Sequence, residues 1–116
     1  MKKIFVLLFG LLAAGQVFAQ ASQNPCNNGA QADFTATTAG LFVTRGFPVR
    51  CSSNVFVNTE QNTIALVVGG ASGKGNNSFR ASTNGGAITG SPCANANVCI
   101  NTDASSGLAA LLSSAT

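Results

Sequence analysis

Four cysteines are the side chains of this chain whose type and spacing could do chemistry. Cys26, Cys51, Cys93 and Cys99 form an even set in a short chain, which is typical of a disulfide framework in a small exported domain. We expect one bridge between Cys26 and Cys51 and another between Cys93 and Cys99, because each pair encloses a compact segment with turn residues at its ends. A proline precedes the first cysteine of each pair. Pairing of Cys26 with Cys93 or Cys99 remains the alternative.

The same cysteines fit a metal site or a redox pair poorly. Structural zinc sites use close cysteine pairs separated by two to four residues, and redox pairs use a Cys-x-x-Cys motif. No two cysteines of this chain have either spacing. We therefore predict structural bridges and no bound metal.

The remaining reactive side chains do not predict an enzyme. The chain has no His, Tyr or Trp, and its three carboxylates, Asp33, Glu60 and Asp103, are far apart in sequence. General acid–base catalysis needs a tuned pair of such groups, and a serine nucleophile needs a base beside it. No catalytic residue is predicted.

A glycine-rich run at 69–75 follows an apolar stretch, as in a phosphate-binding loop. That motif needs a glycine where Val68 stands and a Ser or Thr where Gly75 stands. The mismatch leaves no predicted cofactor. The run is then a polar loop, 69–77, whose candidate interaction residues are Lys74, Asn76 and Asn77.

The first residues have the three parts of a secretory signal. Lys2 and Lys3 precede an apolar run at 4–14, and small residues follow. Cleavage is expected after residue 19, or alternatively after residue 21. The apolar run is shorter than the roughly 20 residues of a membrane span. We expect a secreted protein, at the cell surface or outside it, with the periplasm as the alternative location and no membrane span in the mature chain.

The charge of the mature chain is close to neutral. The full chain has a net charge of +3, and removal of Lys2 and Lys3 leaves four scattered basic residues against three acidic ones, a net charge of +1. Nucleic-acid binding requires a clustered basic face, so no nucleic-acid partner is expected. A surface of Asn, Ser, Thr and Gly gives little repulsion between copies and permits self-association.

The elements that must position these residues read as one small all-β domain. We predict an antiparallel sandwich or partly open barrel of five to seven short strands at 31–101, after a flexible N-terminal arm at 20–30. Polar connections of three residues favour antiparallel neighbours. The predicted strands are 32–37, 41–45 resuming at 49–51, 55–59, the central run 63–70, 78–83, 87–89 and an edge strand at 98–100.

Alternation of apolar and polar residues predicts which side chains face the core. Phe79 and Ala81 should point inward, with Arg80 outward. The full predicted core is Phe34, Phe42, Val43, Phe56, Ile64, Leu66, Val67 and Phe79.

The last segment, 102–116, is predicted to be a short C-terminal helix or a loose tail. Thr102 or Asp103 could cap a helix, and Leu108, Leu111 and Leu112 lie at helical spacing. These leucines either dock on the sheet or form an assembly tail that anchors in a neighbouring subunit.

Export, a neutral surface and the lack of catalytic groups together indicate a structural or adhesive subunit. We expect it to self-associate through sheet edges, with fibres as one outcome, because few lysines guard those edges. The alternative is a soluble periplasmic or secreted binding module, an inhibitor or small-ligand carrier, that uses the 69–77 loop.

Overall fold

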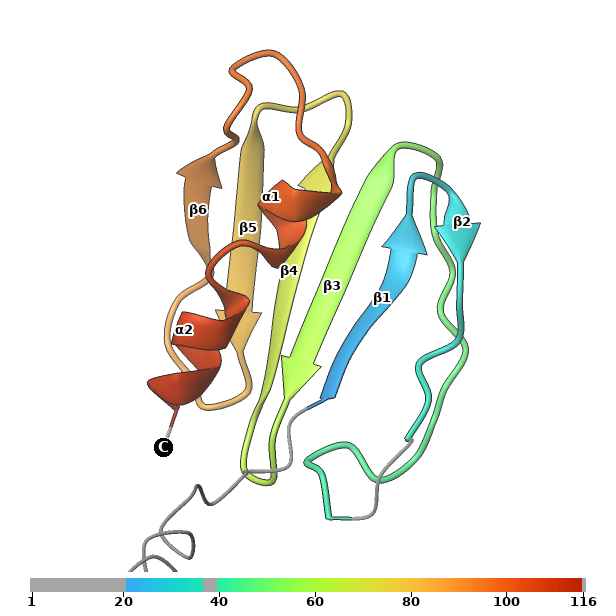
Figure 1. Ribbon diagram of the computed structural model, residues 1–116, viewed down its shortest axis with the longest axis vertical. Helices are drawn as coiled ribbons and strands as arrows, with labels where there is room; N and C mark the ends of the chain where they lie inside the picture. Colours follow the sequence, from blue (N-terminus) through green and yellow to red (C-terminus); the bar gives the residue numbers. More distant parts are fainter. Residues whose placement is uncertain (1–20, 37–39, 116) are drawn as a thin grey trace, which may run out of the picture.

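The computed structural model describes residues 21–36 and 40–115, and within them six strands form one antiparallel sheet. The strands run in the order β2-β1-β3-β4-β5-β6 (Figure 1). The all-β class and the predicted number of strands are confirmed. The predicted signal peptide lies outside the described residues. The strands are β1 (Ala21–Asn27), β2 (Ala30–Gln31), β3 (Val55–Gln61), β4 (Leu66–Ser72), β5 (Asn77–Ser82) and β6 (Thr89–Pro92).

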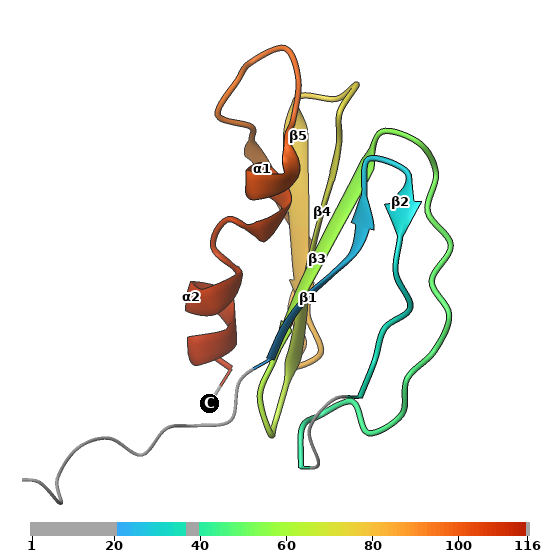
Figure 2. The ribbon, with the colours of Figure 1, turned by 45° about the vertical axis from the view of Figure 1, so that its right-hand side comes forward.

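Two short helices, α1 (Asn101–Ser105) and α2 (Leu108–Ser113), cover one face of the sheet. A largely irregular segment lies on the other side of the sheet (Figure 2). Its described residues are 32–36 and 40–54, and we call it the 32–54 segment. The second layer is therefore not a second sheet, as in a sandwich, but helices on one face and irregular chain on the other.

The β3–β4 hairpin forms the centre of the sheet and confirms the predicted antiparallel connection. Its turn uses Asn62, whose Oδ1 accepts hydrogen bonds from the amides of Ile64 (2.9 Å) and Ala65 (2.8 Å). Because this turn takes up the first residues of the predicted central strand, β4 begins later and ends later than predicted. Ile64 is exposed in the turn, so its placement in the core was wrong.

The main core lies between the sheet and the two helices. Val67 of β4 is fully buried against Leu108 and Leu112 of α2. Beside it, Phe56 of β3 is buried near α1. The complete clusters are Ala65, Val67, Leu108, Leu112 and Ala115, and Phe56, Ala71, Cys93, Cys99 and Ala104.

Gly69 allows α1 to approach the sheet. A Cβ atom at this position would collide with the backbone carbonyl oxygen of Ala104 in α1. The predicted 69–77 loop is thus wrong at both ends, because Gly69 to Ser72 belong to β4 and Asn77 begins β5. Only residues 73–76 form the turn.

Most of the predicted N-terminal arm belongs to the sheet, which the sequence did not predict. Residues 21–27 form β1, which pairs along β3 with a register shift between Gln23 and Cys26, where Pro25 lies. Such a strand has no apolar alternation, and it forms because backbone groups pair irrespective of side chain. A proline is tolerated at a bulge because it cannot donate to the ladder.

The strands predicted at 32–37 and 41–45 are not found among the described residues of the 32–54 segment. A single bridge joins Phe34 to Phe47, whose rings stack with centroids 4.9 Å apart. The amide of Val43 donates to Oε1 of Gln61 on β3 (2.9 Å) instead of to a strand partner. Phe34 is buried, as predicted, but Phe42 is 44% exposed, so its placement in the core was wrong.

Candidate functional site

Both predicted disulfides are present, and all four cysteines lie in the described part of the chain. Cys26–Cys51 ties β1 to the end of the 32–54 segment. Cys93–Cys99 closes the short loop between β6 and α1. The Asp103 carboxylate lies close to Cys93 and Cys99, but sulfur atoms bonded to each other are not thiolate ligands.

Asp103 organises the start of α1. Its Oδ2 accepts the amide of Ile100 (2.8 Å), and its Oδ1 accepts the amide of Ala94 (2.9 Å). These two backbone hydrogen bonds hold the pKa of the carboxyl below its usual value, with partial desolvation acting in the opposite direction. The helix begins at Asn101 with Ile100 as its cap, so Asp103 stands in the third helical position and not at the predicted cap.

The leucines of the predicted assembly tail pack on the sheet. Leu108 and Leu112 are buried in the main core, and Leu111 lies partly buried beside them. The predicted single helix is divided at Gly107, whose φ of +75° is left-handed and whose missing Cβ leaves room for the Arg80 guanidinium. Of the two alternatives for this tail, docking on the sheet is the one observed.

Arg80 and Phe79 of β5 face the opposite way to the prediction. Arg80 pairs with Gly69 and lies on the helix-covered face, where its Nη2 donates to Oγ of Ser91 (3.3 Å). Phe79 pairs with Gly70 on the other face and is 54% exposed. Its placement in the core was wrong. Because side chains alternate along a strand, the choice that sends Arg80 toward the helices sends Phe79 away from them.

We call the uncovered side of β4, β5 and β6 the open face. The 32–54 segment covers the β3 end of this side of the sheet, where Thr59 and Gln61 are buried, but not the β4–β6 end. Its residues are Val68, Gly70, Ser72, Asn77, Phe79, Ala81, Gly90 and Pro92.

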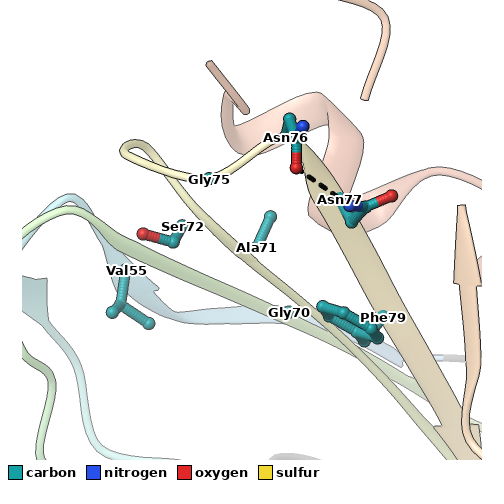
Figure 3. Close-up of a pocket in the computed structure, with 8 residues that line it drawn as sticks. All are labelled: Val55, Gly70, Ala71, Ser72, Gly75, Asn76, Asn77 and Phe79. Carbon is teal, nitrogen blue, oxygen red and sulfur yellow. Dashed lines mark hydrogen bonds between the residues drawn. The ribbon is translucent and has the colours of Figure 1, made fainter. Parts of the chain in front are cut away.

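A hollow of ≈ 420 Å³ lies on the open face beside the 73–76 turn. Figure 3 shows Phe79 next to Gly70, with Ser72 and the two asparagines of the predicted interaction loop nearer the turn. Asn76 and Asn77 line the hollow, and Lys74 is not among its lining residues. The lining is Val55, Gly70, Ala71, Ser72, Gly75, Asn76, Asn77 and Phe79.

The polar groups of the hollow are only partly used within the chain. Nδ2 of Asn77 donates to Oδ1 of Asn76 (2.9 Å), and Oγ of Ser72 accepts the amide of Lys74 (3.3 Å). The hollow therefore offers amide groups, a hydroxyl and an aromatic ring. Such a lining can bind a ligand, and its described residues bring neither an acid nor a base to it.

The outer side of β6 is a second candidate site. No described strand pairs with it, and Thr89, Gly90 and Pro92 are exposed. Ile88, directly before the strand, is 70% exposed. The predicted edge strand at 98–100 is not formed, and β6 runs from Thr89 to Pro92 instead of the predicted 87–89.

Within the described residues, no helix is long and apolar enough to cross a membrane. The two disulfides fit an exported protein. Comparison with protein-family models, with curated proteins and with solved structures finds no match to this chain.

Proposed function

We propose that this protein is an exported, non-enzymatic structural subunit that self-associates by pairing its β6 edge with the β6 edge of a second copy. The observation that carries the proposal is the uncovered, uncharged outer side of β6. Natural proteins guard such an edge with lysines, inward-pointing charges, prolines or very short strands. Of these, β6 has its four-residue length and Pro92 at its end, but no charge. Here the strand reads Thr-Gly-Ser-Pro, and the preceding residues 83–88 are also uncharged.

The ladder to β5 determines which backbone groups face outward. The Cys93 amide donates to the Asn76 carbonyl (2.9 Å) at the end of this ladder. Hydrogen-bonded and non-hydrogen-bonded pairs alternate in antiparallel sheets. Ser91 and Thr89 therefore turn their backbone groups toward β5, whereas Gly90 and Pro92 turn theirs outward.

A two-fold pair centred on Gly90 uses these outward groups. Gly90 of each copy exchanges its N–H and C=O with its equivalent, and the Ile88 amide of one copy reaches the Pro92 carbonyl of the other. Pro92 has no N–H to return, so the pairing is short. The exposed Ile88 side chain gains an apolar contact with Pro92 across the interface.

The geometry favours a closed dimer over a fibre. Pairing of β6 with β6 is isologous and stops at two copies, whereas a fibre needs β6 to pair with a different edge. The other edge, β2, offers only Ala30 and Gln31. A dimer is thus the basic unit that we propose.

Sedimentation velocity of the exported, disulfide-bonded protein tests this proposal. We expect a monomer–dimer equilibrium between about 10 µM and about 1 mM, because a four-residue edge buries less than a standard interface of about 1,600 Å². Ile88→Lys should weaken the association at least about tenfold, since a charge at an edge opposes pairing. Because the Ile88 side chain is exposed, this substitution should not unfold the protein, and weaker association would reflect the interface itself.

Phe42→Lys is the matched control. Phe42 is also an exposed apolar residue, but its amide bonds to Asn62 at the β3–β4 turn, away from β6. This variant should associate like the wild type. A wild-type protein that stays monomeric at about 1 mM, a concentration at which even weak interfaces populate dimers, contradicts the proposal. So does equal weakening by both variants.

A further inference from the structure

Phe79 is a large aromatic residue that is 54% exposed on the open face of the sheet. Its neighbours across the two ladders are both glycines, Gly70 on β4 and Gly90 on β6. The ring lies against Gly90, because a Cβ atom there would be 3.1 Å from Cε1 of Phe79. Toward Gly70 no side chain stands beside it, and Gly70 lines the hollow (Figure 3). One flank of the ring is thus packed and the other is accessible.

Hydrogen-bonding groups lie one step along the same two strands. Ser72 on β4 and Asn77 on β5 each lie two residues closer to the 73–76 turn than Gly70 and Phe79 do. Both are on the open face. The amides of Asn77 and Asn76 bond to each other and so hold each other in place. Their remaining groups, Nδ2 of Asn76 and Oδ1 of Asn77, have no partner among the described residues. The Ser72 hydroxyl accepts a hydrogen bond and keeps its own proton to donate.

The described lining of the hollow carries no charged side chain. A charged ligand would lose its hydration there without gaining an opposite charge. An entirely apolar ligand would leave the amides and the hydroxyl without partners. The complementary ligand is neutral, has one apolar face for the ring, and has a row of hydroxyl groups at its edge.

We propose that this hollow binds a neutral saccharide. One pyranose ring stacks its C–H face on Phe79, and its hydroxyl groups exchange hydrogen bonds with Ser72, Asn76 and Asn77. The open shape suits an extended chain, since sugar units before and after the bound one can leave along the face. The site does not use the outward backbone groups of β6, so it is independent of the proposed dimer.

Amide NMR of the exported, disulfide-bonded protein tests the site with defined probes. Cellohexaose, mannohexaose and maltohexaose are neutral pyranose chains, and an alginate hexamer is a charged counterpart. We expect saturable shifts at residues 70–79 with at least one neutral hexamer, with a Kd of about 1 mM, and none with the alginate hexamer. Phe79→Ala should raise the Kd at least about tenfold, and Phe79→Trp should preserve or lower it, because both effects follow the stacking area.

Two further variants make the result specific. Phe42→Ala removes another exposed phenylalanine, 44% exposed against 54% for Phe79, which lies outside the hollow, and should leave the Kd unchanged. Gly70→Val fills the floor of the hollow beside Phe79, its partner across the ladder. The fold should tolerate the change, since a Cβ at Gly70 meets only the Phe56 carbonyl oxygen at 3.8 Å. Gly70→Val should abolish the shifts in a folded protein, even if Phe79→Ala does not fold.

The outcomes separate this inference from the proposed dimer. Ile88→Lys should bind the hexamer as the wild type does, even where dimerisation is lost. No shift at 70–79 with any neutral hexamer up to about 10 mM, a tenfold excess over the expected Kd, overturns the saccharide site. Tighter binding of the alginate hexamer, or an equal loss in Phe42→Ala, also overturns it.

Discussion

Asp103 shows how one side chain can hold together a loop that has few apolar contacts. Its two oxygens accept hydrogen bonds from the amides of Ala94 and Ile100, the residues directly after Cys93 and Cys99. The residue as a whole is only 8% exposed. Two backbone donors compensate the charge of its carboxylate, which is how a carboxylate at the start of a helix is commonly stabilised.

The lowered pKa of Asp103 predicts a loss of stability in acid. A carboxyl whose pKa is lower in the folded chain than in the unfolded chain adds stability above its unfolded pKa of about 3.9. That contribution disappears as the pH falls through the lower, folded pKa. At pH 7 the melting temperature of Asp103→Asn should therefore be lower than that of the wild type. As the pH falls toward 2, the melting temperature of the variant should fall less than that of the wild type. Circular dichroism melts from pH 7 to pH 2 measure this.

Asp33→Asn is the control for the acid melts. Asp33 is exposed in the 32–54 segment, away from α1. The melting temperature of the Asp33→Asn variant should equal that of the wild type at every pH. If Asp103→Asn and the wild type lose the same number of degrees between pH 7 and pH 2, Asp103 is not the source of the pH dependence.

At the scale of elements, β4 and α1 pack closely against each other. Gly69 lies directly under the backbone of α1, and the next residue, Gly70, lies on the opposite face of the same strand. The two glycines are adjacent in the sequence but have different surroundings. They make a matched pair for measuring what close approach of the helix requires.

Gly69→Ala should be strongly destabilising and Gly70→Ala should not. The new Cβ at position 69 meets the Ala104 carbonyl oxygen, which belongs to backbone and cannot rotate away. Overpacking of this kind costs about 1–3 kcal/mol and occasionally more. At position 70 the nearest atom is 3.8 Å away, so the free energy of unfolding should change by less than about 0.5 kcal/mol. Urea unfolding of both variants decides, and equal stabilities would show that α1 does not depend on Gly69.

At the scale of the whole molecule, each disulfide secures a different layer to the sheet. Cys26–Cys51 spans 25 residues and holds the 32–54 segment, whereas Cys93–Cys99 spans 6 residues and holds the entry to α1. The 32–54 segment has little regular secondary structure among its described residues. It should therefore depend on its bridge more than the helices depend on theirs.

Replacing Cys26 and Cys51 together by alanine should lower the free energy of unfolding by about 3–4 kcal/mol. The loop-entropy model gives about 2–3 kcal/mol for the shorter bridge. Hydrogen exchange measured by mass spectrometry should show faster exchange across 32–54 in the first double variant. In the Cys93→Ala/Cys99→Ala variant the change should fall on α1. Uniformly faster exchange in both variants would argue against separate layers.

Local sequence was sufficient where the determining interactions are local. The disulfide pairing followed from compact spacing, the β3–β4 hairpin from a short polar connection, and the common side of Leu108 and Leu112 from helical periodicity. The two asparagines of the predicted interaction loop do line the hollow. Each of these features depends on residues close together in the chain.

Tertiary structure alone decided the features that depend on a distant partner. The polar residues 21–27 carry no side-chain pattern that predicts a strand. β1 forms because its backbone pairs with that of β3, and backbone pairing leaves no pattern in the side chains. Hydrophobicity placed Phe79 inward, but α1 approaches β4 through Gly69 and takes the opposite face of β5, where Arg80 reaches Gly107. The hollow proposed to bind a saccharide follows from that choice of face, since a strand's alternation fixes two sets of side chains but not which set a helix will cover.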